Sequence, residues 1–221
     1  MAYSQVGIIN LAYSRIGVLR ISSLTEDSEQ RIAATTIWEY VRDLVLEAAD
    51  WRFAKTRVEL AVLVATPEYG YDYAYALPAD FMRLCLQSEN DPVVYPSGAY
   101  SSAWTSDGVT IRARQYGYII EALADGTLCL FSDYDNTDDP LYCTYIRKET
   151  DPAKYTAHFI SALAYRLAAE LSLTRTESRP KFADMMTMYD SEITKAKGLN
   201  RSGDYLKDET GSDSWETAGR I

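Results

Sequence analysis

Histidine and cysteine are scarce in this chain of 221 residues, which contains only His158, Cys85, Cys129 and Cys143. Most metal-dependent hydrolases need several His, Cys or carboxylate ligands, so a single histidine argues against such a site. An odd number of cysteines without Cys-x-x-Cys spacing argues against a disulfide framework or a zinc site, and favours a reducing compartment. We expect His158, which lies in a strongly helical segment, to be a structural or interface residue.

Long apolar runs and the common catalytic signatures are also missing. The longest apolar run, Leu60–Ala65, is far shorter than the ~20 residues that cross a bilayer. The opening Met-Ala-Tyr-Ser-Gln has no basic stretch before an apolar one, which predicts no secretory signal. The sequence contains no Gly-x-Gly-x-x-Gly, phosphate-loop or Gly-x-Ser-x-Gly pattern. We therefore expect no membrane span, no cofactor and no enzymatic activity.

Positive charge is in short supply, whereas tyrosine is abundant. Lys and Arg total 22 against 32 Asp and Glu, a formal net charge of -10. A compact chain this acidic repels phosphate, which argues against nucleic-acid binding driven by a basic surface. The 18 tyrosines far outnumber the 4 tryptophans and 5 phenylalanines. Tyrosine suits half-buried sheet faces and wet interfaces.

One acidic loop, residues 133–139, has the opening of a calcium-binding loop. Its sixth position is Asp138 where such loops have glycine, and its twelfth is Thr144 where they have glutamate. A solvated turn before the next strand is the favoured interpretation. An enzyme that holds a divalent ion on these carboxylates is the alternative.

Apolar residues at three- and four-residue spacing predict helices at both ends of the chain. The second helix opens with Asp27 and Gln30 three residues later, which resembles a capping box. The third opens at Asp151, followed by a proline suited to the first helical position, and the fourth ends at Gly198. The predicted helices cover residues 4–17, 27–49, a stretch from 151 to beyond 171, and 179–198.

Between these helices, alternating apolar residues predict antiparallel strands. Tyr69, Tyr71, Tyr73 and Tyr75 alternate without a break, which places four tyrosines on one sheet face. They form either cross-strand aromatic pairs or a contact surface for a partner. Asp125-Gly126 is a hairpin signal. The other predicted strands are residues 58–62, 84–86, 93–95, 109–112, 116–122, 127–131 and 141–146.

The predicted fold class is α+β, with a helical bundle from both chain ends, a long inserted antiparallel β region and an extended C-terminal tail. The organisation is residues 1–55 for the N-terminal helices, 56–150 for the β region, 151–198 for the C-terminal helices and 199–221 for the tail. A basic corner lies between the last two helices. It is either a solvated turn or a contact for an acidic partner, and comprises Arg175, Arg179 and Lys181.

The tail, residues 199–221, has no helical or strand period and few apolar residues. Such a segment buries too little surface to offset its ordering entropy alone, so we expect it to become ordered only against another surface. Trp215 is the natural anchor, because aromatic residues dominate interface hot spots. Packing on its own domain is the alternative. The candidate contact residues are Tyr205, Leu206, Trp215 and Ile221.

Four segments resemble the head-to-tail adaptors of short-tailed bacteriophages, the tail tubular protein A family. They are Leu11-Ala-Tyr-Ser-Arg-Ile-Gly17, Ile21-Ser-Ser-Leu24, Trp51-Arg-Phe-Ala54 and Tyr73-Ala-Tyr-Ala-Leu-Pro-Ala-Asp-Phe81. As a pattern of elements the resemblance extends over residues 6–197, and it involves no catalytic signature.

The resemblance implies a structural virion protein at the portal vertex, in a ring of twelve copies. Such a ring joins the portal protein to the tail nozzle protein, sometimes carries tail fibres, and leaves a channel through which double-stranded DNA passes without specific binding. The tail would then contact the portal. Two alternatives remain: a tail-completion or stopper protein of a long-tailed phage, which should have a shorter β region, and a carbohydrate-binding β module that stacks sugars on exposed tyrosines and Trp104.

Overall fold

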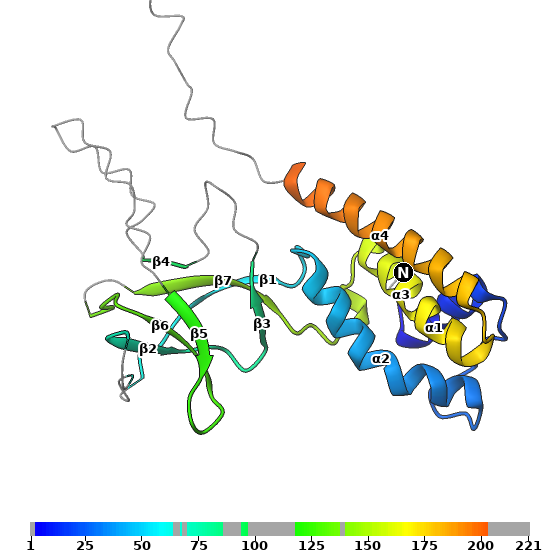
Figure 1. Ribbon diagram of the computed structural model, residues 1–221, viewed down its shortest axis with the longest axis horizontal. Helices are drawn as coiled ribbons and strands as arrows, with labels where there is room; N and C mark the ends of the chain where they lie inside the picture. The colour runs from blue at the N-terminus through cyan, green and yellow to red at the C-terminus, as the bar shows by residue number, and fades with distance from the viewer. Residues whose placement is uncertain are drawn as a thin grey trace, which may run out of the picture.

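The structure is a computed structural model that describes residues 3–63, 67, 70–85, 94–96, 118–137 and 140–202, with side chains described except at 94–96 and 200–202. It has an α+β fold in which helices from the two chain ends pack together and an antiparallel β region lies between them in sequence (Figure 1). The elements are α1 (Gln5–Ile16), α2 (Glu29–Ala48), β1 (Lys55–Glu59), β2 (Tyr73–Ala76), β3 (Phe81–Leu84), β4 (Val94–Pro96), β5 (Tyr118–Ala122), β6 (Leu128–Ser132), β7 (Leu141–Arg147), the 3-10 turn η2 (Pro152–Lys154), α3 (Ala157–Arg175) and α4 (Arg179–Ser202).

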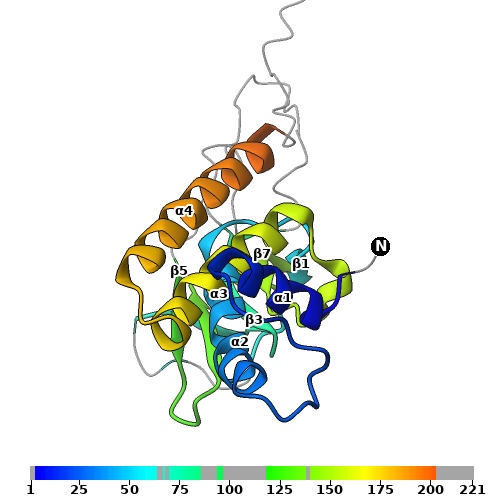
Figure 2. The same cartoon turned by 90° about the vertical axis from the view of Figure 1, so that its right-hand side faces the viewer.

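The helical bundle is organised around α3, which packs against each of the other three helices (Figure 2). Its buried residues include Phe159, Leu163 and Leu167, all fully enclosed. The link from α1 to α2 is held by Asn10, whose amide donates to the Ile21 carbonyl at 2.9 Å and accepts from the Ile21 N–H at 2.8 Å. The two ends of the chain therefore share one apolar core.

The β region forms two antiparallel sheets. The first has the order β1-β7-β3, with β4 also paired to β7, and the second has the order β2-β6-β5. A core that includes Tyr75 and Leu130 from the second sheet and Cys143 from the first fills the space between them. Three positions further along β7, Ile146 belongs instead to the core of the helices. The two faces of β7 thus join the sheets to the bundle.

Ion pairs between the β region and the C-terminal half of α2 reinforce this packing. Arg83 on β3 lies 2.9 Å from the Asp50 carboxylate and donates to the Glu47 carbonyl at the end of α2, at 2.8 Å. A cation is favourable at a helix C-terminus, where carbonyl groups lack partners. Lys148 lies 2.9 Å from Asp43, also on α2.

The structure confirms the predicted bounds of the first helix and corrects the predicted start of the second. Ser4 caps α1 and Gly17 ends it with a φ of 75°, a left-handed conformation that favours glycine. The cap of α2 is Ser28, not Asp27: the Ser28 hydroxyl accepts from the Arg31 N–H at 3.1 Å. The predicted capping box of Asp27 and Gln30 is therefore wrong: the cap lies one residue later, and the third helical residue is then Arg31, which cannot accept a hydrogen bond. Serine and aspartate are both favoured caps, so the sequence does not distinguish these neighbours.

Both C-terminal helix boundaries also differ from the sequence prediction. After Asp151 the chain makes only the turn η2, and α3 begins at Ala157, because Tyr155 takes extended backbone angles and buries its ring against Phe159. Helix α4 continues through Gly198 to Ser202. Residues 199–202, which were predicted to belong to a tail without helical structure, are therefore part of α4.

The predicted strands agree with the structure in the second half of the β region and are displaced in the first half. Strands β5, β6 and β7 lie close to their predicted ranges, and Gly126 makes the hairpin turn with a φ of 85°. The predicted strand 58–62 is instead Lys55–Glu59, followed by an isolated bridge at Val62, and β3 starts at Phe81, three residues early. The strand predicted at 109–112 lies outside the described residues.

The turn before α2 contains a carboxylate with an unusually low pKa. Hydrogen bonds from the Ser22 and Ser28 side chains lower the pKa of Glu26 to about 2. Because the folded pKa lies below the unfolded value of ~4.3, the stabilisation is complete above that value and is lost as the pH falls towards 2. We expect Glu26→Gln to lower the melting temperature at pH 6, and the difference from the natural chain to vanish near pH 2. Exposed Glu39→Gln on α2 is the control, and should change the melting temperature little.

Candidate functional site

The structure separates Tyr71 from Tyr73 and Tyr75, three of the four tyrosines that were predicted to share one sheet face. Tyr75 is fully buried between the two sheets, and its hydroxyl donates to the Tyr134 carbonyl. Tyr73 packs on the same core, whereas Tyr71 packs on the opposite face of the sheet, against the cluster that includes Phe131. Tyr69 lies outside the described residues. The prediction of a partner contact is therefore wrong for Tyr75, because its side chain has no exposed surface.

Removing the Tyr75 hydroxyl tests this placement. Tyr75→Phe removes the buried hydroxyl that donates to the Tyr134 carbonyl, which should lower the free energy of unfolding by ~1–2 kcal/mol. Urea denaturation measures the change. Tyr71→Phe is the matched control, and a larger loss there than at Tyr75 would contradict the assigned burial.

The basic corner is largely engaged inside the molecule. Arg175 donates to Glu29 on α2 at 3.0 Å, and Lys181 donates to the carbonyl of Ile16, the last residue of α1, at 3.0 Å. These contacts tie the turn between α3 and α4 to the N-terminal helices. Arg179 is exposed. Two of the three residues of this corner, Arg175 and Lys181, therefore make contacts within the chain.

The histidine and the cysteines occupy structural positions. His158 is half exposed on α3, with Nδ1 3.8 Å from the Glu192 carboxylate on α4. The three cysteines are free and buried. Burial raises the pKa of Cys143 to about 12, so its thiol stays neutral at physiological pH. No helix in the described part of the chain is long and apolar enough to cross a membrane.

The acidic loop is folded as a turn. Asp133 accepts from the Asp72 N–H at 3.2 Å, and Asp135 accepts from the Thr137 N–H at 2.9 Å. Asp138 and Asp139 lie outside the described residues. Within the described ranges, no group of three or more His, Cys, Asp or Glu side chains is placed to hold a metal ion.

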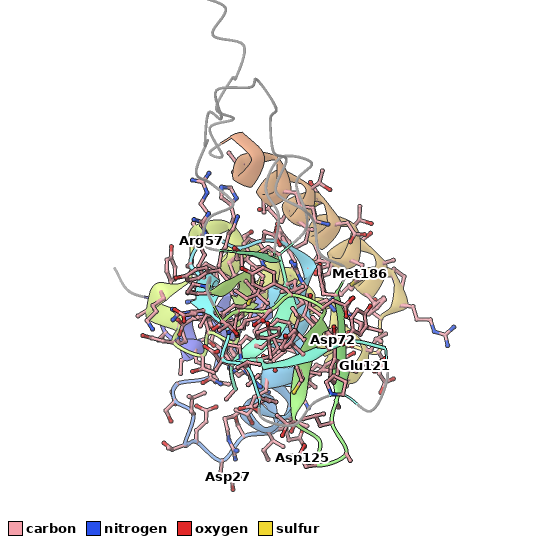
Figure 3. The ribbon with its side chains drawn as sticks, turned by 90° about the vertical axis from the view of Figure 1, so that its left-hand side faces the viewer. Asp27, Arg57, Asp72, Glu121, Asp125 and Met186 are labelled. Carbon is pink, nitrogen blue, oxygen red and sulfur yellow. The ribbon has the colours of Figure 1, made fainter. Side chains whose placement is uncertain are left out.

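The second sheet presents a surface of one charge sign, which we call the acidic sheet end. Residues 58–82 and 115–146, which contain its three strands, include no lysine or arginine. Hydrogen bonds from Thr127 lower the pKa of Asp125, so this carboxylate stays charged at neutral pH. Figure 3 shows Asp72, Glu121 and Asp125 on this end of the molecule, apart from Arg57. The exposed acids of this surface are Asp72, Glu121, Asp125, Asp133 and Asp135.

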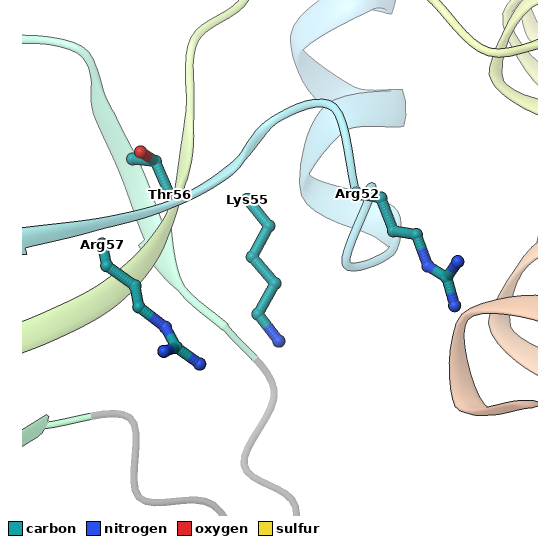
Figure 4. Close-up of a pocket in the computed structure, with 4 residues that line it drawn as sticks. All are labelled: Arg52, Lys55, Thr56 and Arg57. Atoms are coloured by element: carbon teal, nitrogen blue, oxygen red, sulfur yellow. The ribbon is translucent and has the colours of Figure 1, made fainter. Parts of the chain in front are cut away.

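Basic side chains gather at a second place, which we call the basic hollow. Arg52, Lys55, Thr56 and Arg57 line a surface cavity of about 510 Å³ (Figure 4). The tight turn after α2, in which the Lys55 N–H donates to the Trp51 carbonyl at 2.8 Å, brings Arg52 beside the start of β1. Strand alternation then places Lys55 and Arg57 on one side of β1.

Arg52 also connects the basic hollow to the C-terminal helix. Its guanidinium donates to the Leu199 carbonyl in the last turn of α4, at 3.5 Å. Lys55 and Arg57 form no ion pair with any side chain in the described ranges. The basic hollow was not predicted from the sequence. Three basic residues within six positions of an acidic chain were the available signal.

Comparison with known proteins gives no further guide. No family model matches the chain, and no curated protein matches it. The four tail residues singled out from the sequence, Tyr205, Leu206, Trp215 and Ile221, lie outside the described residues. The case for a function therefore depends on the fold and on the distribution of charge.

Proposed function

We propose that this chain is a structural virion protein, the head-to-tail adaptor subunit that joins the portal to the tail nozzle of a short-tailed phage. The observation that carries the proposal is the arrangement of the chain: helices from both ends form one bundle, and the β region extends from it as an insertion. This is the arrangement that the resemblance implies. Copies arranged as a ring would leave a channel, and fibres or the nozzle would contact its outer surfaces.

The charge distribution supports a passive channel for DNA. Binding of duplex DNA gains most of its affinity when cationic side chains displace counterions from phosphates. A subunit with a net charge of -10 and an acidic sheet end has few cationic side chains that could displace counterions from DNA. The duplex is therefore expected to slide past the subunits. The carbohydrate-binding alternative is weakened, because Tyr75 is buried and offers no surface for a sugar. Trp104, the other residue named for that alternative, lies outside the described residues.

The mass of the purified chain, alone and after mixing with phage portal, tests the proposal. We expect a 24.9 kDa monomer alone and a high-order complex with portal. Deleting residues 203–221 leaves α4 complete and should abolish the complex, because the tail carries the proposed portal contacts.

Single substitutions refine this experiment. Trp215→Ala should weaken the complex more than Tyr205→Ala does, because tryptophan is the larger hot-spot residue. A complex that survives the deletion would keep the adaptor function and remove the role of the tail. Failure to associate with portal under any condition would overturn the adaptor function itself.

A further inference from the structure

The basic hollow contains two cations, Lys55 and Arg57, for which the described residues supply no carboxylate partner. Several cations near the same end of α2 do have carboxylate partners: Arg83 pairs with Asp50 at 2.9 Å and Lys148 with Asp43 at 2.9 Å. Lys55 and Arg57 have no such partner in the described ranges, although acidic residues outnumber basic ones by ten. Two adjacent cations on one face of a strand repel each other, so an anionic occupant would relieve that repulsion.

The position of the basic hollow limits what can reach it. The hydrogen bond from Arg52 to Leu199 places the last turn of α4 at its edge, and α4 ends at Ser202. Figure 4 shows the Arg52 side chain directed towards the end of that helix. An extended chain advances about 3.3 Å per residue, so seven residues after Ser202 span about 23 Å. The start of the tail therefore reaches every residue that lines the hollow.

The composition of the tail complements the hollow. Residues 203–221 contain five carboxylate side chains against two cations, Lys207 and Arg220. Three of the five acids lie within the first seven residues after α4, which are the tail residues nearest in sequence to the basic hollow's edge. The five acids are Asp204, Asp208, Glu209, Asp213 and Glu216.

We propose that the acidic segment 204–216 docks on the basic hollow of its own chain. Carboxylates of the segment pair with Lys55 and Arg57, while Arg52 holds the end of α4 that delivers the segment there. Exposed ion pairs are individually weak and are screened by salt, so the contact is a reversible latch. A partner that binds the tail more tightly then displaces it. This inference concerns the free chain and does not depend on the adaptor function.

Zero-length carbodiimide cross-linking of the full-length chain tests the proposal. The reagent joins a lysine amine to a carboxylate in direct contact, and mass spectrometry identifies the joined peptides. We expect a cross-link between Lys55 and a carboxylate of residues 204–216. The pair of Lys154 with Glu149, whose atoms lie 3.1 Å apart, is the internal standard. An equal mixture of unlabelled and ¹⁵N-labelled chains identifies contacts within one copy, which never join a light peptide to a heavy one.

The matched variants are Arg57→Gln in the basic hollow and Arg20→Gln, an exposed arginine on the link between α1 and α2. Arg57→Gln should lower the Lys55 cross-link about threefold relative to the standard, the effect of one exposed ion pair. Arg20→Gln should leave it unchanged. About 0.5 M salt should remove it, because screening then acts within about 4 Å.

Three results would overturn the proposal. The first is no Lys55 cross-link to the tail while the standard forms. The second is a cross-link that joins light to heavy peptides, which would assign the hollow to a second copy. The third is absence of the cross-link together with binding of a fluorescent DNA duplex that Arg57→Gln abolishes, which would assign the hollow to phosphate. A loss of portal binding alone bears only on the adaptor function.

Discussion

Replacing Trp51 with alanine is expected to lower the free energy of unfolding by ~3–5 kcal/mol, the usual cost of truncating a buried tryptophan. The side chain is 2% exposed, and its indole N–H donates to the Val45 carbonyl at 2.7 Å. Its ring packs edge-on against Phe159, with centroids 5.0 Å apart. The substitution removes contacts between the end of α2 and the start of α3, and leaves a cavity where the bundle meets the sheets.

Urea denaturation of the natural and variant chains measures this loss. Tyr40→Ala is the control, because Tyr40 lies on α2 with 60% of its side chain exposed and should change stability by less than ~0.5 kcal/mol. Trp51→Phe should recover more than half of the loss, since it keeps the aromatic packing and gives up the indole hydrogen bond. Equal effects of Trp51→Ala and Tyr40→Ala would contradict the packing described for this residue.

The helices were predictable because their signal is local. Residues such as Val41 and Val45 recur at helical spacing, and each proves fully buried against α3 or its neighbours. The start of α3 was not predictable in the same way. Asp151-Pro152 is compatible with a long helix or a short turn, and the burial of Tyr155 against Phe53 and Phe159 decides for the turn. Phe53 lies far from Tyr155 in sequence, so no local pattern contains this information.

The tyrosine repeat shows a different limit of sequence patterns. Alternation predicts that residues two apart share a face, and Tyr73 and Tyr75 do. It does not say whether that face is covered. Here it lies against the first sheet, and the other face carries its own apolar cluster of Ala74, Cys129 and Phe131. Of the two interpretations left open by the sequence, a contact surface for a partner does not fit Tyr75, whose side chain is buried between the two sheets.

The charged sites depend even more on tertiary structure. Arg175 and Lys181 were recognised as a basic corner, but their partners Glu29 and Ile16 belong to the other end of the chain. The basic hollow was not predicted because Arg52 lies in the turn after α2 and Arg57 lies in a strand. Only the turn at Trp51 and the arrival of α4 bring their side chains to one cavity.

Replacing Glu149 is also expected to cause a large loss of stability, because its carboxylate is nearly buried and accepts hydrogen bonds from three donors. The side chain accepts from Arg147 at 2.6 Å, from Lys154 at 3.1 Å and from the Asp151 N–H at 3.1 Å. We expect Glu149→Ala to lower the free energy of unfolding by ~2–3 kcal/mol, a typical value for hydrogen bonds to a charged group. The loss stays below that of a fully buried ion pair, because Arg147 and Lys154 retain access to water.

The pH dependence separates the charge of Glu149 from its shape. Burial alone would raise the pKa of this carboxyl, but the hydrogen bonds from Asp151 and Lys154 and the nearby positive charges lower it overall. A lowered folded pKa means that the stabilisation is complete above the unfolded value of ~4.3 and is lost as the pH falls below it. Glu149→Gln keeps an acceptor for the Asp151 N–H, so it should lose only ~1 kcal/mol at pH 7. Its difference from the natural chain should shrink in urea titrations repeated from pH 6 down to pH 3. A difference that grows as the pH falls would show that the Glu149 carboxyl has a raised pKa in the folded chain, and that burial outweighs its donors.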